Sequence, residues 1–133
     1  MDHCILDSKT FKRVMWFKLF MVLFPWALIP LFIPVAWLPS LGIHFTLFQV
    51  MLLRLWGIVV LTVFFLYLHI YLRPHSKLSR FFMLFGMCDN GGLGILFAVG
   101  TIIYKLPLII AINSPILLFF GYWFAVFRKR GKF

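Results

Sequence analysis

Acidic residues are scarce in this chain: Asp and Glu together number 3 in 133 residues, against 13 Lys and Arg. The acids are Asp2, Asp7 and Asp89, so the chain has no paired carboxylates of the kind that general acid–base catalysis uses. It also lacks an HExxH helix, a phosphate-binding loop and a Ser/His/Asp arrangement. We therefore expect a protein that is not an enzyme.

Cysteine and histidine are too few and too scattered to predict a metal or haem site. Cys4 lies in the polar N-terminus, whereas Cys88 lies inside an apolar segment beside Asp89. A disulfide framework or a zinc site would need ligands that are closer or more numerous. His44 and His69 lie near opposite ends of one segment, which does not suit a haem held at one depth. We expect no metal and no cofactor, and we interpret Cys88 as a packing residue.

Apolar residues, in contrast, are abundant. The chain is 64% hydrophobic and 20% aromatic, and its mean hydropathy is +1.05. Soluble domains are about half apolar, so lipid must be the main solvent of this chain. At roughly 20 residues for each crossing, there is room for about four spans. The sequence predicts an all-α polytopic membrane protein, one domain over residues 1–133, folded as a four-transmembrane-helix bundle with spans at 17–38, 46–72, 81–104 and 106–127.

The first predicted span contains three prolines, Pro25, Pro30 and Pro34. Proline removes a backbone donor and bends a helix, although membrane helices tolerate it where neighbours satisfy the freed carbonyl groups. We therefore expect a proline-bent first helix. The bend has two interpretations: a hinge or wall of a binding groove, or a helix curved to fit its bundle.

Basic residues give the chain a net charge of +10, and they lie in clusters between the predicted spans. In a four-span topology three clusters fall on one side: Lys9, Lys12, Arg13 and Lys18; Arg73, Lys77 and Arg80; and Arg128, Lys129, Arg130 and Lys132. The opposite side holds only Lys105, and Arg54 lies inside a span. Since cytoplasmic loops carry the excess of Lys and Arg, we expect both termini in the cytoplasm, at a bacterial inner membrane. The same distribution argues against a nucleic-acid partner.

Polar residues inside the spans predict one connected layer. Asp89 and Asn90 lie within the third span, and an intramembrane acid normally faces a partner or a cavity. Counting about 1.5 Å per residue places Arg54 about 12 Å and Asp89 about 18 Å below the outer boundary of a roughly 30 Å core. An arginine side chain can cover that gap, so Arg54 is the expected partner of Asp89. Asn113 and Ser114 lie at a similar depth in the fourth span.

The Arg54–Asp89 pair has two interpretations. It is a structural clasp, in which each charge offsets the burial cost of the other, or it is a ligand or proton site, since intramembrane ionisable residues often mark one. One acid and one base balance, and no second acid completes a proton relay, so the clasp is favoured.

A family resemblance rests on three stretches: RLWGIVVL at 54–61, YLRP at 71–74, and the glycine-rich third span. Together, from Leu53 to Gly100, they resemble small four-helix bacterial membrane proteins of the DoxX type. Those families place an arginine followed by a glycine in a hydrophobic helix, here Arg54 and Gly57. The proline-rich first span and Asp89–Asn90 do not match that pattern. The resemblance implies an accessory role in a membrane oxidoreductase system and supplies no catalytic residues.

These features predict a non-catalytic integral membrane protein, an accessory or assembly subunit of a larger membrane complex. The alternative is a small binder or carrier of a lipophilic or anionic molecule, such as a quinone, a lipid or an organic anion, with its site at Arg54 and Asp89. The expected partners are the lipid bilayer and other membrane subunits or further copies of the chain.

The topology has a direct test. A reporter that is active only in the cytoplasm should be active when fused after Phe133 or inserted within residues 75–77, because both positions follow or lie in basic clusters. The same reporter should be inactive near Leu41. Equal activity at Leu41 and at the C-terminus would contradict the four-span topology.

Overall fold

The computed structural model describes residues 4–133, and every regular element in that part of the chain is helical. Four stretches are long and apolar enough to cross a membrane: Lys9–Phe32, Leu47–Leu72, Lys77–Tyr104 and Leu108–Arg130. The prediction of an all-α fold with four transmembrane helices is therefore confirmed.

The first and last stretches each combine several elements. In chain order the elements are η1 (Ile5–Asp7), α1 (Lys9–Leu23), η2 (Phe24–Leu28), α2 (Ile29–Phe32), η3 (Val35–Trp37), η4 (Pro39–Leu41), α3 (Leu47–Leu72), α4 (Lys77–Tyr104), α5 (Leu108–Ala111) and α6 (Asn113–Arg130). Polar side chains cap the N-termini of α1, α3 and α4. Ser8 accepts a hydrogen bond from the Phe11 amide, Thr46 forms a capping box with Gln49, and Ser76 caps α4.

The first span differs from the predicted 17–38 at both ends. It begins at Lys9, because Ser8 supplies the N-cap, and the basic residues of that region lie on the helix instead of before it. It ends at Phe32 because the residue before a proline is driven out of the helical region. Accordingly, Ile33 has φ −56° and ψ 129°, and the chain then runs through the short turns η3 and η4.

The three prolines act differently along this span. Near Pro25 the helix widens into the π-helical turn η2, where the Ile29 amide bonds to the carbonyl of Phe24. Pro30 lies in the first turn of α2, and Pro34 lies beyond the helix. The first helix is thus interrupted at Pro25, as the proline pattern predicts for that position, but Pro34 terminates the helix instead of bending it.

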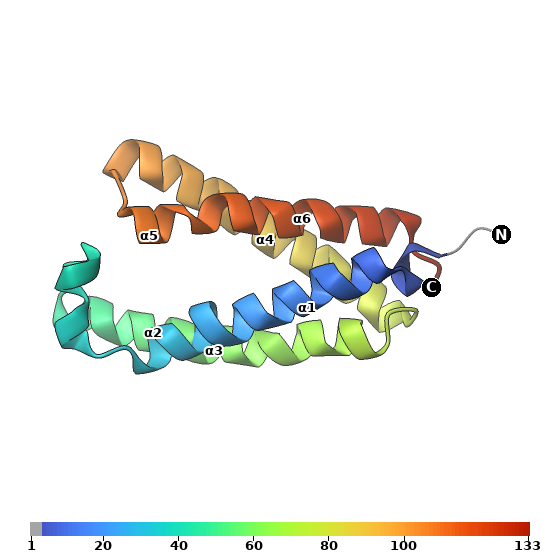
Figure 1. The fold of residues 1–133 in the computed structure, drawn as a ribbon, viewed down its shortest axis with the longest axis horizontal. Coiled ribbons are helices and arrows are strands. Elements are labelled where there is room, and N and C mark those ends of the chain that lie inside the picture. Colours follow the sequence, from blue (N-terminus) through green and yellow to red (C-terminus); the bar gives the residue numbers. More distant parts are fainter. Residues whose placement is uncertain (1–3) are drawn as a thin grey trace.

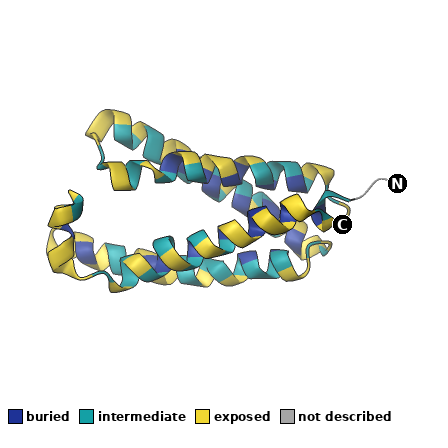
Figure 2. Cartoon of the chain, in the orientation of Figure 1, coloured by how far each residue is buried: buried dark blue, intermediate teal, exposed yellow. Residues whose placement is uncertain are grey.

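The long helices form two hairpins that meet at one end. The first span packs against α3, and α4 packs against α6, whereas α3 and α4 contact each other little although they are consecutive. Figure 1 shows the two hairpins together near the chain termini and apart at the other end. The buried apolar cluster joins them near the termini (Figure 2); its members include Leu6, Phe11, Met15, Tyr67, Ile70, Met83, Phe120, Phe124 and Phe127.

Glycine allows the helices of the second hairpin to pack backbone against backbone. A Cβ at Gly121 would lie 3.0 Å from the Gly91 nitrogen and 3.2 Å from the Gly91 Cα, so one helix would have to move. A Cβ at Gly94 would meet Leu118 at 2.8 Å. Small residues serve this purpose at membrane helix interfaces, where close packing replaces the hydrophobic effect.

This contact predicts the effect of one added methyl group. Gly121→Ala should lower the free energy of unfolding in detergent by about 1–3 kcal/mol, the usual cost of overpacking. The new methyl group would meet backbone atoms of Gly91, which cannot move aside by a rotation as a side chain can. Gly92→Ala is the matched control on α4, since a Cβ there meets nothing within 4 Å, and it should leave stability unchanged or slightly raised. Equal losses in both variants would contradict the close α4–α6 contact.

Candidate functional site

A cavity of about 670 Å³ lies between the two hairpins, lined by residues from all four spans. On the first span, Phe11 and Met15 belong to the buried cluster near the termini, whereas Trp26 and Ile29, farther along, line the cavity. The cavity therefore opens where the hairpins separate. Its lining is largely apolar and includes Val22, Pro25, Leu53, Val60, Leu93 and Leu117.

Lys18 lies where the hairpins part, and its side chain is 1% exposed. Its ammonium group donates a hydrogen bond to Oδ1 of Asn90 on α4. The nitrogen also lies 4.7 Å from the ring centre of Trp26, 4.6 Å from that of Tyr67 and 4.7 Å from that of Phe120. Aromatic faces attract a cation most strongly where water is absent. Groups from all four spans thus compensate the buried charge: Trp26 from its own span, Tyr67 from α3, Asn90 from α4 and Phe120 from α6.

A directed series of hydrogen bonds runs from this lysine to Asp89. Asn90 Nδ2 donates to Tyr67 Oη at 3.0 Å and to the carbonyl of Gly86 at 2.6 Å. Tyr67 Oη in turn donates to Oδ2 of Asp89 at 3.3 Å. Each donor points from the cation toward the anion, an order in which neighbouring hydrogen bonds polarise and strengthen one another.

The predicted Arg54–Asp89 pair is wrong. In the described part of the chain, no hydrogen bond or ion pair joins the two residues. Arg54 instead donates from Nη1 to the carbonyl of Pro30 at 2.9 Å and from Nη2 to the carbonyl of Ile33 at 2.6 Å. Pro34 has no N–H to offer the Pro30 carbonyl four residues earlier, and a carbonyl without a partner is costly in lipid. The guanidinium group therefore caps the end of the first helix, where its charge also suits the helix dipole.

The remaining polar residues do not form one layer with Arg54. Asn113 accepts a hydrogen bond of 2.7 Å from Trp26 Nε1, which links the first span to the fourth. Ser114 donates to the carbonyl of Gly94 at 2.7 Å and so lies within the second hairpin. Of the residues predicted for the layer, only Asp89 and Asn90 share the cluster around Lys18.

Lys18, Tyr67 and Trp26 are the site residues that sequence reasoning missed. The basic pattern places Lys18 in the cytoplasmic cluster, but it follows Phe11 and Met15 at helical spacing, on the face that the structure buries. That periodicity was the available signal. Without Lys18 the N-terminal cluster still holds Lys9, Lys12 and Arg13, so the argument for orientation is unchanged.

The site presents a largely apolar volume with a few hydrogen-bonding groups in its lining. Asp89 is half-buried and lines the cavity, as do Lys18, Tyr67 and Asn90. Among the described residues that line it, Asp89 is the only carboxylate. The arrangement therefore suits the orientation of a bound molecule by hydrogen bonds.

The buried lysine predicts a stability effect. Lys18→Met keeps the length of the side chain but removes its charge, leaving Asn90 Oδ1 and Asp89 without their cation. Unfolding in detergent should become easier by about 1–2 kcal/mol, the scale of intramembrane polar contacts. Lys12→Met, an exposed change on the same helix, should have little effect. Adding Asp89→Asn to Lys18→Met should recover part of the loss; strictly additive losses would contradict the coupling.

Comparison with family models, with curated proteins and with solved structures finds no match for this chain. The resemblance to DoxX-type proteins therefore stays a prediction.

Proposed function

We propose that the protein binds an uncharged lipophilic small molecule in the cavity between its two hairpins, with the polar end of that molecule toward Asp89 and Tyr67. The supporting observation is a largely apolar cavity of about 670 Å³ whose lining includes a connected hydrogen-bond series. Ligand sites of about 300–1,000 Å³ commonly combine an apolar lining with a few fixed polar groups.

The charges of the site favour a neutral ligand over an organic anion. The positive charge of Lys18 is balanced by Asp89 at the other end of the series and is shielded by three aromatic rings. Both terminal nitrogens of Arg54 already bond to backbone carbonyl groups. An anion would thus gain no uncompensated cation. A hydroxyl group, as in a quinol, would find an acceptor in Asp89.

We further propose a cytoplasmic membrane of a bacterium as the location, with both termini in the cytoplasm. Cys4, where the described chain begins, and the C-terminal segment lie at the same end of the molecule (Figure 1), together with the basic clusters around Arg73–Arg80 and after Phe127. In that orientation the hairpins separate toward the opposite face, so a lipophilic ligand would enter from the outer half of the bilayer.

An accessory role in a larger complex is a second proposal, supported by an aromatic stripe on the first span. Trp16, Phe20 and Phe24 follow one another at intervals of one helical turn and are 64%, 47% and 53% exposed. Phe20 and Phe24 stack with ring centres 5.7 Å apart. A rigid aromatic stripe suits packing against a further membrane helix, from another subunit or from a second copy of this chain.

Purification in mild detergent followed by native mass spectrometry tests both proposals. The wild-type protein should retain one lipophilic species that is enriched over the bulk lipid extract. Leu93→Trp adds bulk at the cavity wall, whereas Ile95→Trp adds it on the outer face of the same helix, 61% exposed and away from the cavity. Only Leu93→Trp should lose the enriched species, by at least about tenfold, since filling a pocket removes the volume the ligand needs.

Two results would contradict the proposed binding. One is wild-type protein that carries only the bulk lipid mixture. The other is equal retention in both tryptophan variants. Co-purifying membrane proteins, lost when Phe20 is changed to Ala, would support the accessory role; a monomer without protein partners would contradict it.

A further inference from the structure

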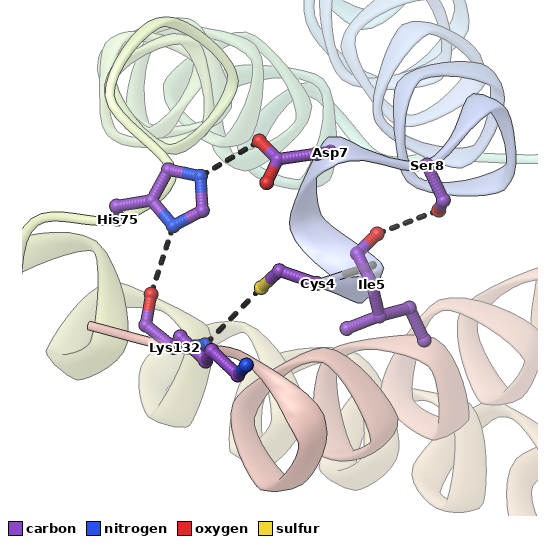
Figure 3. A network of polar contacts seen from close by, with 6 residues as sticks. All are labelled: Cys4, Ile5, Asp7, Ser8, His75 and Lys132. Atoms are coloured by element: carbon purple, nitrogen blue, oxygen red, sulfur yellow. Dashed lines mark hydrogen bonds and ion pairs between the residues drawn. The ribbon is translucent and has the colours of Figure 1, made fainter. Parts of the chain in front are cut away.

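Three segments that are remote in the sequence meet at the end of the molecule that holds the termini. They are the N-terminal turn η1 with Cys4 before it, the loop between α3 and α4, and the residues after α6 (Figure 3). Their side chains include a thiol, a carboxylate and an imidazole: those of Cys4, Asp7 and His75. The ligand atoms of these three residues all lie within 4.8 Å of one another.

The hydrogen bonds fix the tautomer of the imidazole. His75 Nδ1 lies 2.8 Å from the carbonyl oxygen of Lys132, which only accepts, so Nδ1 must carry a proton. His75 Nε2 then faces Oδ1 of Asp7 at 2.8 Å. A lone pair on that nitrogen would oppose a lone pair on the carboxylate, so a cation must lie between them. In the metal-free protein a proton fills that place, in a hydrogen bond between Nε2 and the carboxylate.

Cys4 makes a metal ion the better occupant. Its sulfur accepts a hydrogen bond of 3.3 Å from the Lys132 amide, which orients the sulfur within the cluster. Sulfur, imidazole nitrogen and carboxylate oxygen are the three ligand types of zinc, with bonds of about 2.0–2.3 Å. In a tetrahedral site such bonds place ligand atoms roughly 3.3–3.8 Å apart, a small adjustment from the present geometry. The thiolate and the carboxylate would cancel the double charge of the ion in this basic region.

The backbone supplies the supporting contact that zinc-binding histidines require. In most such sites the ring nitrogen that does not bind metal donates to a carbonyl or carboxylate, which fixes the tautomer and orients the ring. The Lys132 carbonyl already accepts such a hydrogen bond from His75 Nδ1. Because the same residue also bonds to Cys4 through its amide, the C-terminal segment orients two of the three ligands at once.

We propose that Cys4, Asp7 and His75 form a Zn²⁺ site that ties the N-terminal segment to the loop between α3 and α4, with water as the fourth ligand. Sequence spacing predicts no metal site, because these residues come together only after the helices have packed. The site is separate from the cavity between the hairpins and does not depend on the function proposed for it.

Cobalt titration of the full-length protein in detergent tests this site. The protein should be purified without a polyhistidine tag, treated with EDTA and then titrated with Co²⁺. We expect one equivalent to produce a sulfur-to-cobalt charge-transfer band and the visible bands of tetrahedral Co²⁺, and Zn²⁺ to abolish both. Cys4→Ser should remove the charge-transfer band and weaken Zn²⁺ binding, measured by competition with a chromogenic chelator, by at least about tenfold.

Matched variants make the test decisive. Cys88→Ser changes the other cysteine, which lies in the membrane-spanning part of α4, and His69→Gln changes a histidine outside the cluster; both should leave the spectrum unchanged. Asp7→Asn should weaken binding while leaving the thiol in place, and circular dichroism should show that each variant is folded. Absence of the charge-transfer band from the wild-type protein, or its persistence in Cys4→Ser, would overturn the proposal and leave a shared proton between His75 and Asp7.

Discussion

A lysine ammonium inside a membrane span must find its partners in the protein, and Lys18 finds them on every other span. The hydrogen bond to Asn90, with the rings of Tyr67 and Phe120, fixes the distance between the two hairpins at the point where they separate. Apolar side chains close the bundle on the side of the termini. On the other side the hydrogen bond from Trp26 to Asn113 links the two hairpins, and the cavity lies between them there. The buried charge thus sets both the position and the polarity of the site.

The same requirement explains the contacts of Arg54, the other cation of the spans, which is half-buried. A proline-terminated helix in lipid leaves carbonyl groups that water cannot reach, and Arg54 satisfies two of them. The arginine belongs to the shape of the first span, because it lets that span end at Phe32 while the chain continues through non-helical turns. Gly57, on the same helix, allows the approach: a Cβ there would lie 2.8 Å from the carbonyl of Ala27. Arg54 and Gly57 therefore both contribute to the contact between α3 and the first span.

Hydropathy and the placement of basic residues were enough to predict four helices. Both signals depend only on whether a segment lies in lipid or in water, and not on how the helices pack. Helix ends were predicted less well, since Ser8 and Pro34 set them by local backbone chemistry. The pairing of buried charges was not predictable from depth. Arg54 and Asp89 lie at compatible heights, but they line different parts of the bundle, and only the rotation of each helix decides which residues meet. A lysine near the N-terminus is read as a topology signal, and helical periodicity alone marks Lys18 as a residue of the interior.

The separation of Lys18 and Asn90 in the chain, 72 residues, has a consequence for synthesis. At roughly 5–20 residues per second, about 4–14 s pass between translation of the lysine and translation of its partner. Within that interval α3 is also translated, but Lys18 has no hydrogen-bond acceptor from α4. The side chain must then extend toward the aqueous interface, and the first helix cannot settle at its final depth until α4 has been inserted. Lys18 therefore cannot reach its final contacts before α4 and α6, which carry Asn90 and Phe120, have been synthesised.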